Sequence, residues 1–328
     1  MPITNKLILG IESSCDESAI AIVENGRKII TSQIESQINL HEKYGGVVPE
    51  IASRYHVQAI TALIETALTT SKINPASLSA IACTQGPGLI GTLLVGLNTA
   101  KALSYAWNKP LLGVNHLYAH ICSCLLESNL EPPFLALLIS GGHTELRLFE
   151  SYTKSQLIGE SLDDAIGEAF DKIARILSLK YPGGPELENL AKSGDLNYVK
   201  FPVAKVSNYD FSFSGLKTNI YRYCEKNPQY DAASVAACAQ SALTQALLTK
   251  TLKAINDFKA NKLVVCGGVS ANNFIRQQFL SNIHIPINFP DLNFCTDNAA
   301  MIASAAYFNP KPIMYNATAF SRSKPLDS

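Results

Sequence analysis

The sequence lacks the features that mark secreted and membrane-spanning proteins. Its eight cysteines are scattered and no two of them form a C-x-x-C pair, which speaks against a disulfide framework and fits a reducing compartment. No uninterrupted apolar run reaches the roughly 18 residues that a membrane helix needs. The first apolar stretch, residues 7–11, is cut short by Glu12 and Asp16 before a signal-peptide core could form. We therefore expect a cytoplasmic protein that does not associate with a membrane.

The chain also lacks an excess of charge of either sign. Lys+Arg and Asp+Glu each number 27, whereas a self-sufficient nucleic-acid-binding domain usually carries a positive surplus. If RNA is the substrate, a local patch or a partner must supply the attraction. Of the 328 residues 47% are hydrophobic and 16% are charged, which is enough to bury a large core. A globular enzyme of one or two domains is expected.

A strand–loop–strand unit occurs twice along the chain, at residues 7–23 and 135–149. The loops read Ser-Ser-Cys at 13–15 and Ser-Gly-Gly at 140–142, and such small residues let backbone N–H groups approach an anion closely. This duplication predicts an α/β fold in which the two loops face each other across a cleft and can hold a nucleotide. We expect an N-terminal lobe of residues 1–131, to which residues 298–328 return, and a C-terminal lobe of residues 132–297.

A third loop points at the same cleft. The predicted strand at 262–266 ends in Gly267 and Gly268, and a helix capped by Ser270 or Asn272 follows. Backbone donors and the positive end of a helix then meet at the carboxyl edge of a sheet, where α/β folds bind nucleotides.

Two histidines are spaced for metal binding. His116 and His120 stand four residues apart, so on a helix both imidazoles project from one face. Two ordinary helix-surface histidines are the competing interpretation, and Asp297 is the candidate third ligand that would change it. Leu117 occupies the position where a metalloprotease helix carries its glutamate, so peptide hydrolysis of that kind is disfavoured.

Acidic residues gather in two places. Glu12, Asp16 and Glu17 crowd the first loop, where carboxylates commonly hold a metal or orient a nucleophile. The face shared by Asp164, Glu168 and Asp171 on a predicted helix favours a nearby cation or ligand. A solvated turn and a solvated face are the respective alternatives.

The order and spacing of eight motifs resemble one family over nearly the whole chain. The motifs are GIESSCDES at 10–18, GGVVPEIASR at 45–54, GPGL at 86–89, SGGHT at 140–144, DDAIGEAFDK at 163–172, YPGGP at 181–185, FSFSGLK at 211–217 and GGVSAN at 267–272. Together they are similar to the Kae/TsaD (Gcp, YgjD) family of tRNA N6-adenosine threonylcarbamoyltransferases. The resemblance implies a two-lobed, duplicated actin-like ATPase (ASKHA, ribonuclease H-like) fold with central mixed sheets and an interlobe nucleotide cleft.

The resemblance also implies the site residues. One divalent metal ion, Fe²⁺ or Zn²⁺, would be held by His116, His120 and Asp297. The adenine nucleotide, as substrate or product, would be bound by Leu138, Ile139, Ser140, Gly141, Gly142, Asp171, Gly184, Glu188 and Asn272. Asp16 is the candidate for orienting the attacking amine or the metal's water, with Glu12 beside it as a second catalytic carboxylate.

The implied reaction is transfer of threonylcarbamoyl from its adenylate to N6 of the adenosine beside the anticodon, in tRNAs that read codons starting with A, with release of AMP. Expected partners are tRNA, a TsaB-like paralogue in a heterodimer, a TsaE-like ATPase and a TsaC-type synthase that supplies the adenylate. The alternatives are a small-molecule kinase on the same fold and a non-catalytic nucleotide switch in the same pathway.

Two segments depart from the pattern of bacterial relatives. Around the metal pair the sequence reads NHLYAH at 115–120, which keeps both presumed ligands and changes their neighbours. The tail reads RSKPL at 322–326 in place of an arginine-tryptophan-proline-leucine ending, so no tail-specific role is carried over.

Overall fold

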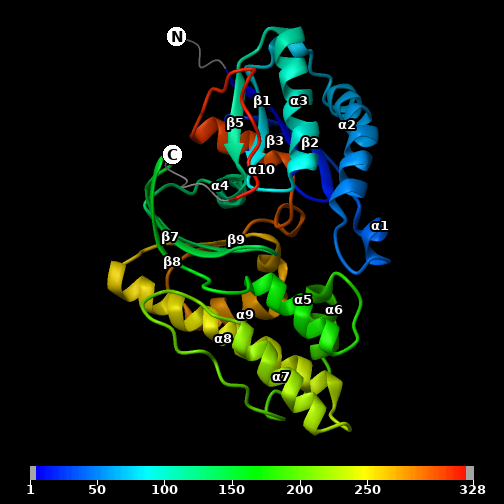
Figure 1. The fold of residues 1–328 in the computed structure, drawn as a ribbon. Coiled ribbons are helices and arrows are strands. Elements are labelled where there is room, and N and C mark those ends of the chain that lie inside the picture. The colour runs from blue at the N-terminus through cyan, green and yellow to red at the C-terminus, as the bar shows by residue number, and fades with distance from the viewer. Residues whose placement is uncertain (1–4, 323–328) are drawn as a thin grey trace. The chain divides into compact units, whose positions relative to one another are not determined.

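The computed structural model describes residues 5–322 (Figure 1). The atypical tail at 323–326 lies outside the described residues. The chain divides into two compact units. Unit 1 comprises the chain up to Glu131, the segment Ser151–Lys154 and the chain from Pro290 onward. Unit 2 comprises Pro132–Glu150 and Ser155–Phe289. The lobe limits expected from the sequence stay a prediction.

Unit 1 is built on a five-stranded sheet of order β3-β2-β1-β4-β5. Its strands are β1 (Leu7–Glu12), β2 (Glu17–Glu24), β3 (Lys28–Ser36), β4 (Ala80–Gly86) and β5 (Leu111–Asn115). Its helices are α1 (Ile38–Glu42), α2 (Pro49–Ser71), α3 (Ile90–Trp107), α4 (His116–Cys122) and α10 (Ala299–Phe308). The central strand β1 pairs antiparallel with β2 and parallel with β4, so the sheet is mixed.

Unit 2 repeats this arrangement in a sheet of order β10-β9-β6-β7-β8. Its strands are β6 (Phe134–Ile139), β7 (Thr144–Ser151), β8 (Lys154–Glu160), β9 (Leu263–Cys266) and β10 (Ile287–Asn288). Its helices are α5 (Ile166–Ile176), α6 (Gly183–Ala191), α7 (Ser214–Lys226), α8 (Ala232–Phe258) and α9 (Asn273–Asn282). Here β6 pairs antiparallel with β7 and parallel with β9, as β1 does with β2 and β4. The duplication predicted from the two loops is confirmed.

The two faces of the unit 1 sheet are covered differently. Leu9 and Ile11 of β1 pack into an apolar cluster that includes Ile60 of α2 and Leu97 of α3. Gly10 points to the opposite face, where a Cβ would lie 2.3 Å from the carbonyl oxygen of Ala299. Because glycine meets a helix of small residues, α10 lies directly against β1. Asp297, two residues before α10, therefore lies near the end of that strand.

Unit 2 places its helices on one face of its sheet. The inward side chains of β6 and β9, such as Leu137 and Val265, join one cluster with the apolar sides of α5 to α9. The apolar pattern of the sequence predicts helices at 52–69, 89–107 and 165–177, and the structure has them as α2, α3 and α5, with ends that differ by three residues or fewer. Short 3-10 helices lie at Pro75–Ser77, Ser123–Leu125, Gly268–Ala271 and Leu292–Phe294.

None of the helices in residues 5–322 has both the length and the apolar character that crossing a bilayer requires.

Candidate active site

The histidine pair stands on a short helix that begins directly after a strand. Asn115, the last residue of β5, accepts hydrogen bonds from the backbone N–H groups of Leu117 and Tyr118, at 2.9 and 3.2 Å, and so caps α4. The four-residue spacing then places both imidazoles on one face of α4, with ring centroids 4.7 Å apart.

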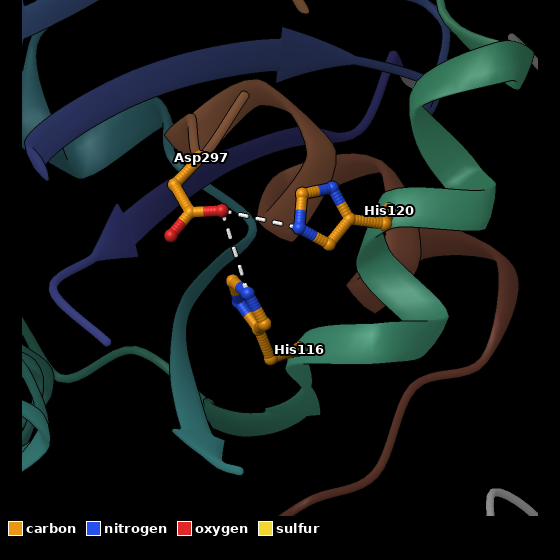
Figure 2. A group of neighbouring side chains, drawn as sticks. All are labelled: His116, His120 and Asp297. Carbon is orange, nitrogen blue, oxygen red and sulfur yellow. Dashed lines mark ion pairs between the residues drawn. The ribbon is translucent and has the colours of Figure 1, made fainter. Parts of the chain in front are cut away.

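Asp297 joins this pair from the other end of the chain (Figure 2). Its Oδ1 lies 3.4 Å from Nε2 of His116 and 3.1 Å from Nε2 of His120. One ligand atom from each of the three residues lies within 4.8 Å of the other two. Two imidazoles and one carboxylate with open positions form a donor set that fits a divalent transition metal such as Fe²⁺ or Zn²⁺. The structure thus brings together all three side chains that were expected to bind metal.

Glu12 stands behind His116. It is fully buried, and its Oε2 lies 3.1 Å from Nδ1 of His116. Its Oε1 accepts a hydrogen bond from the Ser14 N–H at 2.6 Å, and Oε2 accepts one from the Thr84 hydroxyl at 2.7 Å. Nδ1 of His116 therefore faces the Glu12 carboxylate, and Nε2, on the side of Asp297, is the nitrogen that would bind an ion.

The charges of these groups favour the binding of a cation between them. Burial lowers the pKa of His116, but the negative charges of Asp297 and Glu12 outweigh burial and hold this pKa well above its ordinary value. Burial raises the pKa of Asp297, but the two imidazoles outweigh it and hold this pKa far below its ordinary value. The carboxylate of Asp297 therefore stays ionised and available for coordination.

The loop that carries Asp16 is pinned by buried groups. The Cys15 carbonyl lies 2.9 Å from Nε2 of His56, and the Asp16 carbonyl accepts a hydrogen bond from the Gln37 N–H at 3.0 Å. Glu17 begins β2, and burial, followed by the charges of Asp297 and Asp16, raises its pKa to about 10. Glu17 therefore lies buried in a strand and is not the solvated turn residue of the alternative interpretation.

The glycine loop of unit 2 leaves its backbone accessible. A Cβ added at Gly141 or Gly142 would meet no atom within 4 Å. The Ser140 carbonyl accepts a hydrogen bond from the Gly167 N–H at 3.2 Å, and a Cβ at Gly167 would lie 2.6 Å from Cα of Gly141. The start of α5 therefore supports the loop from behind, and the outer side of Gly141 and Gly142 is open to a ligand.

Asp171 lies further along α5 and holds the start of α6. Its Oδ1 accepts a hydrogen bond from the Gly183 N–H at 2.9 Å. Burial raises the pKa of Asp171, and the backbone N–H groups of Gly183 and Gly184 partly oppose this. A Cβ at Gly183 would lie 2.9 Å from Cα of Asp171, so only glycine permits this contact.

The loop at 267–268 lies beside the glycine loop at 140–142. Gly267 has φ +90°, and a Cβ there would lie 2.5 Å from the carbonyl oxygen of Ile139. Asn272 caps α9, and its Nδ2 donates to Oε1 of Gln240 at 2.9 Å. Glu188 accepts a hydrogen bond from the neighbouring Asn273 N–H at 2.8 Å. The parallel pairing of β6 and β9 therefore joins these loops at one sheet edge.

A pocket of about 260 Å³ adjoins this edge. Polar and aromatic groups line it, among them Glu188, Lys192, Gln240, Asn273 and Phe274. Its size is near the lower end for small-ligand sites. Glu188 therefore lines this hollow, and Asn272 contacts its wall through Gln240. Leu138 to Gly142 end β6 and form the loop after it, whereas Asp171 lies in the middle of α5 and Gly184 at the start of α6.

Two motifs have a structural role instead of the ligand contact that was considered. Lys172 forms an ion pair with Asp164, and Nζ of Lys217 lies 3.8 Å from Oδ2 of Asp164. The cation expected beside the acidic face of α5 is therefore supplied by lysine side chains of the protein. Asp163 accepts hydrogen bonds from the hydroxyl of Ser212 and the N–H of Phe213, at 2.6 and 2.8 Å. The hydroxyl-rich turn at 212–217, with its lysine, could by sequence contact phosphate or RNA or cap a helix, and in the structure it forms the start of α7.

Sequence reasoning missed the supporting residues Thr84, His56 and Gln37. Thr84 had a usable signal, because the register of β1 and β4 pairs Ile11 with Cys83 and so places Thr84 beside Glu12. His56 and Gln37 had none, since their contacts depend on how α2 and α1 pack on the sheet.

Comparisons with known proteins agree with these features. The family model described as "TsaD: tRNA N6-adenosine threonylcarbamoyltransferase" matches residues 28–304. A relative from Carboxydothermus hydrogenoformans is 49% identical over 308 residues, which is 92% of each chain. One from Kosmotoga olearia is 50% identical over 310 residues, or 93% of each chain. Both are named tRNA N6-adenosine threonylcarbamoyltransferase.

Solved structures support the fold. Full-length HypF in its phosphate- and nucleotide-bound form matches with TM-score 0.65 and 15% identity, over 92% of this chain and 55% of HypF. Component A of the (R)-2-hydroxyglutaryl-CoA dehydratase of Acidaminococcus fermentans matches with TM-score 0.54 and 15% identity, over 92% and 98%. The two-lobed actin-like α/β fold expected from the sequence is confirmed, and so is the family. The chain belongs to the tRNA N6-adenosine threonylcarbamoyltransferases, enzymes that transfer a threonylcarbamoyl group to a tRNA adenosine.

Proposed function

We propose that the enzyme holds one divalent metal ion, Fe²⁺ or alternatively Zn²⁺, through His116, His120 and Asp297. The observation that carries this proposal is the convergence of the three ligand atoms within 4.8 Å. When bound, such an ion supplies Lewis-acid polarisation to an oxygen of the substrate. We assign Glu12 to positioning His116, because its buried carboxylate is fully engaged by Ser14, Thr84 and that imidazole.

The adenylate is assigned to the loops that follow the carboxyl ends of β6 and β9 in unit 2. The open backbone at Gly141 and Gly142 supports binding of the AMP phosphate, since N–H donors there would stabilise charge on the departing group. Asp171 and Gly184 would form the adjoining wall, and Glu188 with Asn272 would border the nucleoside. In the reaction a bond forms between N6 of the tRNA adenosine and the carbamoyl carbon, and the bond from that carbon to the AMP oxygen breaks. N6 loses one proton, which Asp16 or water would accept. Asp16 is the proposed group that orients the amine.

The expected partners stay proposals. They are a TsaB-like paralogue in a heterodimer, a TsaE-like ATPase and a TsaC-type synthase. The equal counts of acidic and basic residues support a complex that shares the tRNA-binding surface, because phosphate contacts dominate affinity for nucleic acids. A cytoplasmic location agrees with tRNA as the substrate.

The test is to measure metal content, AMP binding and transfer for His116→Ala, His120→Ala and Asp297→Asn. We expect each variant to lose most of its metal and its transfer activity while AMP affinity stays near that of the wild-type protein. Glu50→Gln is the matched control, because Glu50 is exposed and its ion pair with Arg54 is on the surface of α2. Full metal content in all three variants would overturn the assignment of ligands.

A further inference from the structure

The residues between α1 and α2 form an exposed segment that the proposed mechanism does not use. In this 43–48 segment Tyr44 is 54% exposed, and the Nζ atom of Lys43 lies 5.3 Å from the centre of its ring. Gly45 and Gly46 follow with φ +68° and +156°, and a Cβ at either would meet no atom within 4 Å. An aromatic ring, a cation and two glycines with open space around them therefore lie next to one another on the surface.

Buried hydrogen bonds tie this segment to the loop of Asp16. The Gln37 N–H donates to the Asp16 carbonyl at 3.0 Å, and Oε1 of Gln37 lies 3.2 Å from Nε2 of His41. His41 is fully buried, and its Nδ1 accepts a hydrogen bond from the Val48 N–H at 3.3 Å. Since Nδ1 accepts, Nε2 carries the hydrogen and donates to Gln37. His41 thus holds Val48 at one end of the 43–48 segment, and Gln37 connects His41 to the backbone of Asp16. Asp16 is the residue assigned to orient the amine.

We propose that Tyr44 is a stacking platform for an unpaired base of the tRNA anticodon loop, next to the adenosine that is modified. Proteins recognise single-stranded RNA by stacking splayed bases on aromatic rings while cations follow the phosphates. Tyr44 supplies the ring, Lys43 the cation, and the two glycines leave room for the sugar–phosphate backbone. The inference rests on the proposed function, because Asp16 must act near the same adenosine.

A protein partner is the competing occupant of this surface. Protein interfaces have an apolar centre, but Tyr44 is the one large apolar side chain that is exposed among residues 37–48. A single ring flanked by a lysine and two glycines matches a nucleotide better than a protein interface.

The test uses the tagged full chain, isolated with the proteins that co-purify with it, and an anticodon stem–loop RNA. The RNA carries 2-aminopurine beside the target adenosine, so stacking is read as quenching. We expect Tyr44→Ala to weaken binding about tenfold and to abolish the quenching, whereas Tyr44→Phe keeps affinity within about twofold. Lys43→Ala should lower the slope of log affinity against log salt by about 0.7. Tyr105→Ala is the matched control, because Tyr105 is 80% exposed but lies on α3.

Wild-type RNA affinity in Tyr44→Ala would overturn the proposal, as would equal losses in Tyr44→Phe or Tyr105→Ala. Loss of a co-purifying protein from Tyr44→Ala, with RNA affinity retained, would identify a protein-docking surface instead. Metal content and AMP affinity should be unchanged in Tyr44→Ala. A failure of the metal assignment would appear in the His116→Ala metal content, so the two failures are distinguishable.

Discussion

Oε2 of Glu12 lies 3.1 Å from Nδ1 of His116, on the side of the imidazole opposite to the nitrogen that faces Asp297. A buried carboxylate in this place orients the ring and keeps the hydrogen on Nδ1 when Nε2 binds an ion. The same carboxylate also holds the backbone of Ser14, so the first loop and the histidine helix share one support.

Replacing Glu12 should therefore weaken metal binding without removing a ligand. We expect Glu12→Gln to lower metal affinity by about 10- to 100-fold, because an amide can donate to Nδ1 and so permits the wrong tautomer. Competition with a chelator of known affinity measures this. If Glu12→Gln bound metal as tightly as the Glu50→Gln control, the positioning role would be wrong.

A change at Asp16 should lower the rate of transfer and leave metal binding unchanged. If its carboxylate orients the attacking amine, Asp16→Asn lowers the rate of transfer by about a hundredfold, as expected for loss of a proton-accepting group, and leaves metal content unchanged. Single-turnover transfer from preloaded adenylate to tRNA gives the rate directly. Retention of the full rate would remove Asp16 from this role.

Two alanine variants should distinguish a glycine whose backbone contacts AMP from a glycine that only supports the loop. Gly142→Ala introduces a methyl group into open space, so we expect weaker AMP binding, by about tenfold, and unchanged stability. Gly167→Ala puts its Cβ 2.6 Å from the Ser140 carbonyl and should reduce both AMP affinity and stability. Calorimetric titration and urea unfolding of both variants test this, and unchanged AMP affinity in Gly142→Ala would contradict direct backbone contact.

The packing of α10 on β1 should be intolerant of any side chain. A Cβ at position 10 would lie 2.3 Å from the Ala299 carbonyl oxygen and 2.9 Å from the Ala303 nitrogen, and neither backbone atom can move aside. We expect Gly10→Ala to lower the free energy of unfolding by about 3 kcal/mol. Gly215→Ala is the control, since its Cβ meets nothing within 4 Å on helix α7 and alanine favours helix there by up to about 1 kcal/mol.

Buried His56 should make stability depend on pH. Burial lowers its pKa below 6.5, so between the two pKa values the unfolded chain binds a proton that the folded chain does not. Stability then falls as the pH drops below 6.5, by at most about 1.4 kcal/mol per pH unit. Urea midpoints from pH 7.5 to 5 should change less steeply for His56→Gln than for the wild-type protein, even though the variant also loses hydrogen bonds. Parallel pH profiles would show that His56 is not the group responsible.

Much of the site could be read from local sequence because local spacing decides it. Four residues on a helix align two side chains, which is why His116 and His120 were recognisable as a pair. Small residues after an apolar strand free the backbone, which is why the sequence predicts anion sites at the loops 13–15 and 140–142, and these stay predictions. The duplicated α/β architecture follows from the repetition of that unit.

The tertiary structure decided which distant groups complete these local features. Asp297 reaches the histidines because α10 lies directly against Gly10, a contact between backbones that no spacing along the chain expresses. Glu12 supports His116 because parallel pairing of β1, β4 and β5 ends three strands at one edge. The sequence by itself determined the pair, the loops and the family, since these depend on neighbours in the chain. The position of Asp297 beside the histidines and the hydrogen bonds of Glu12 depend on packing between segments far apart in sequence. Only the fold specifies that packing.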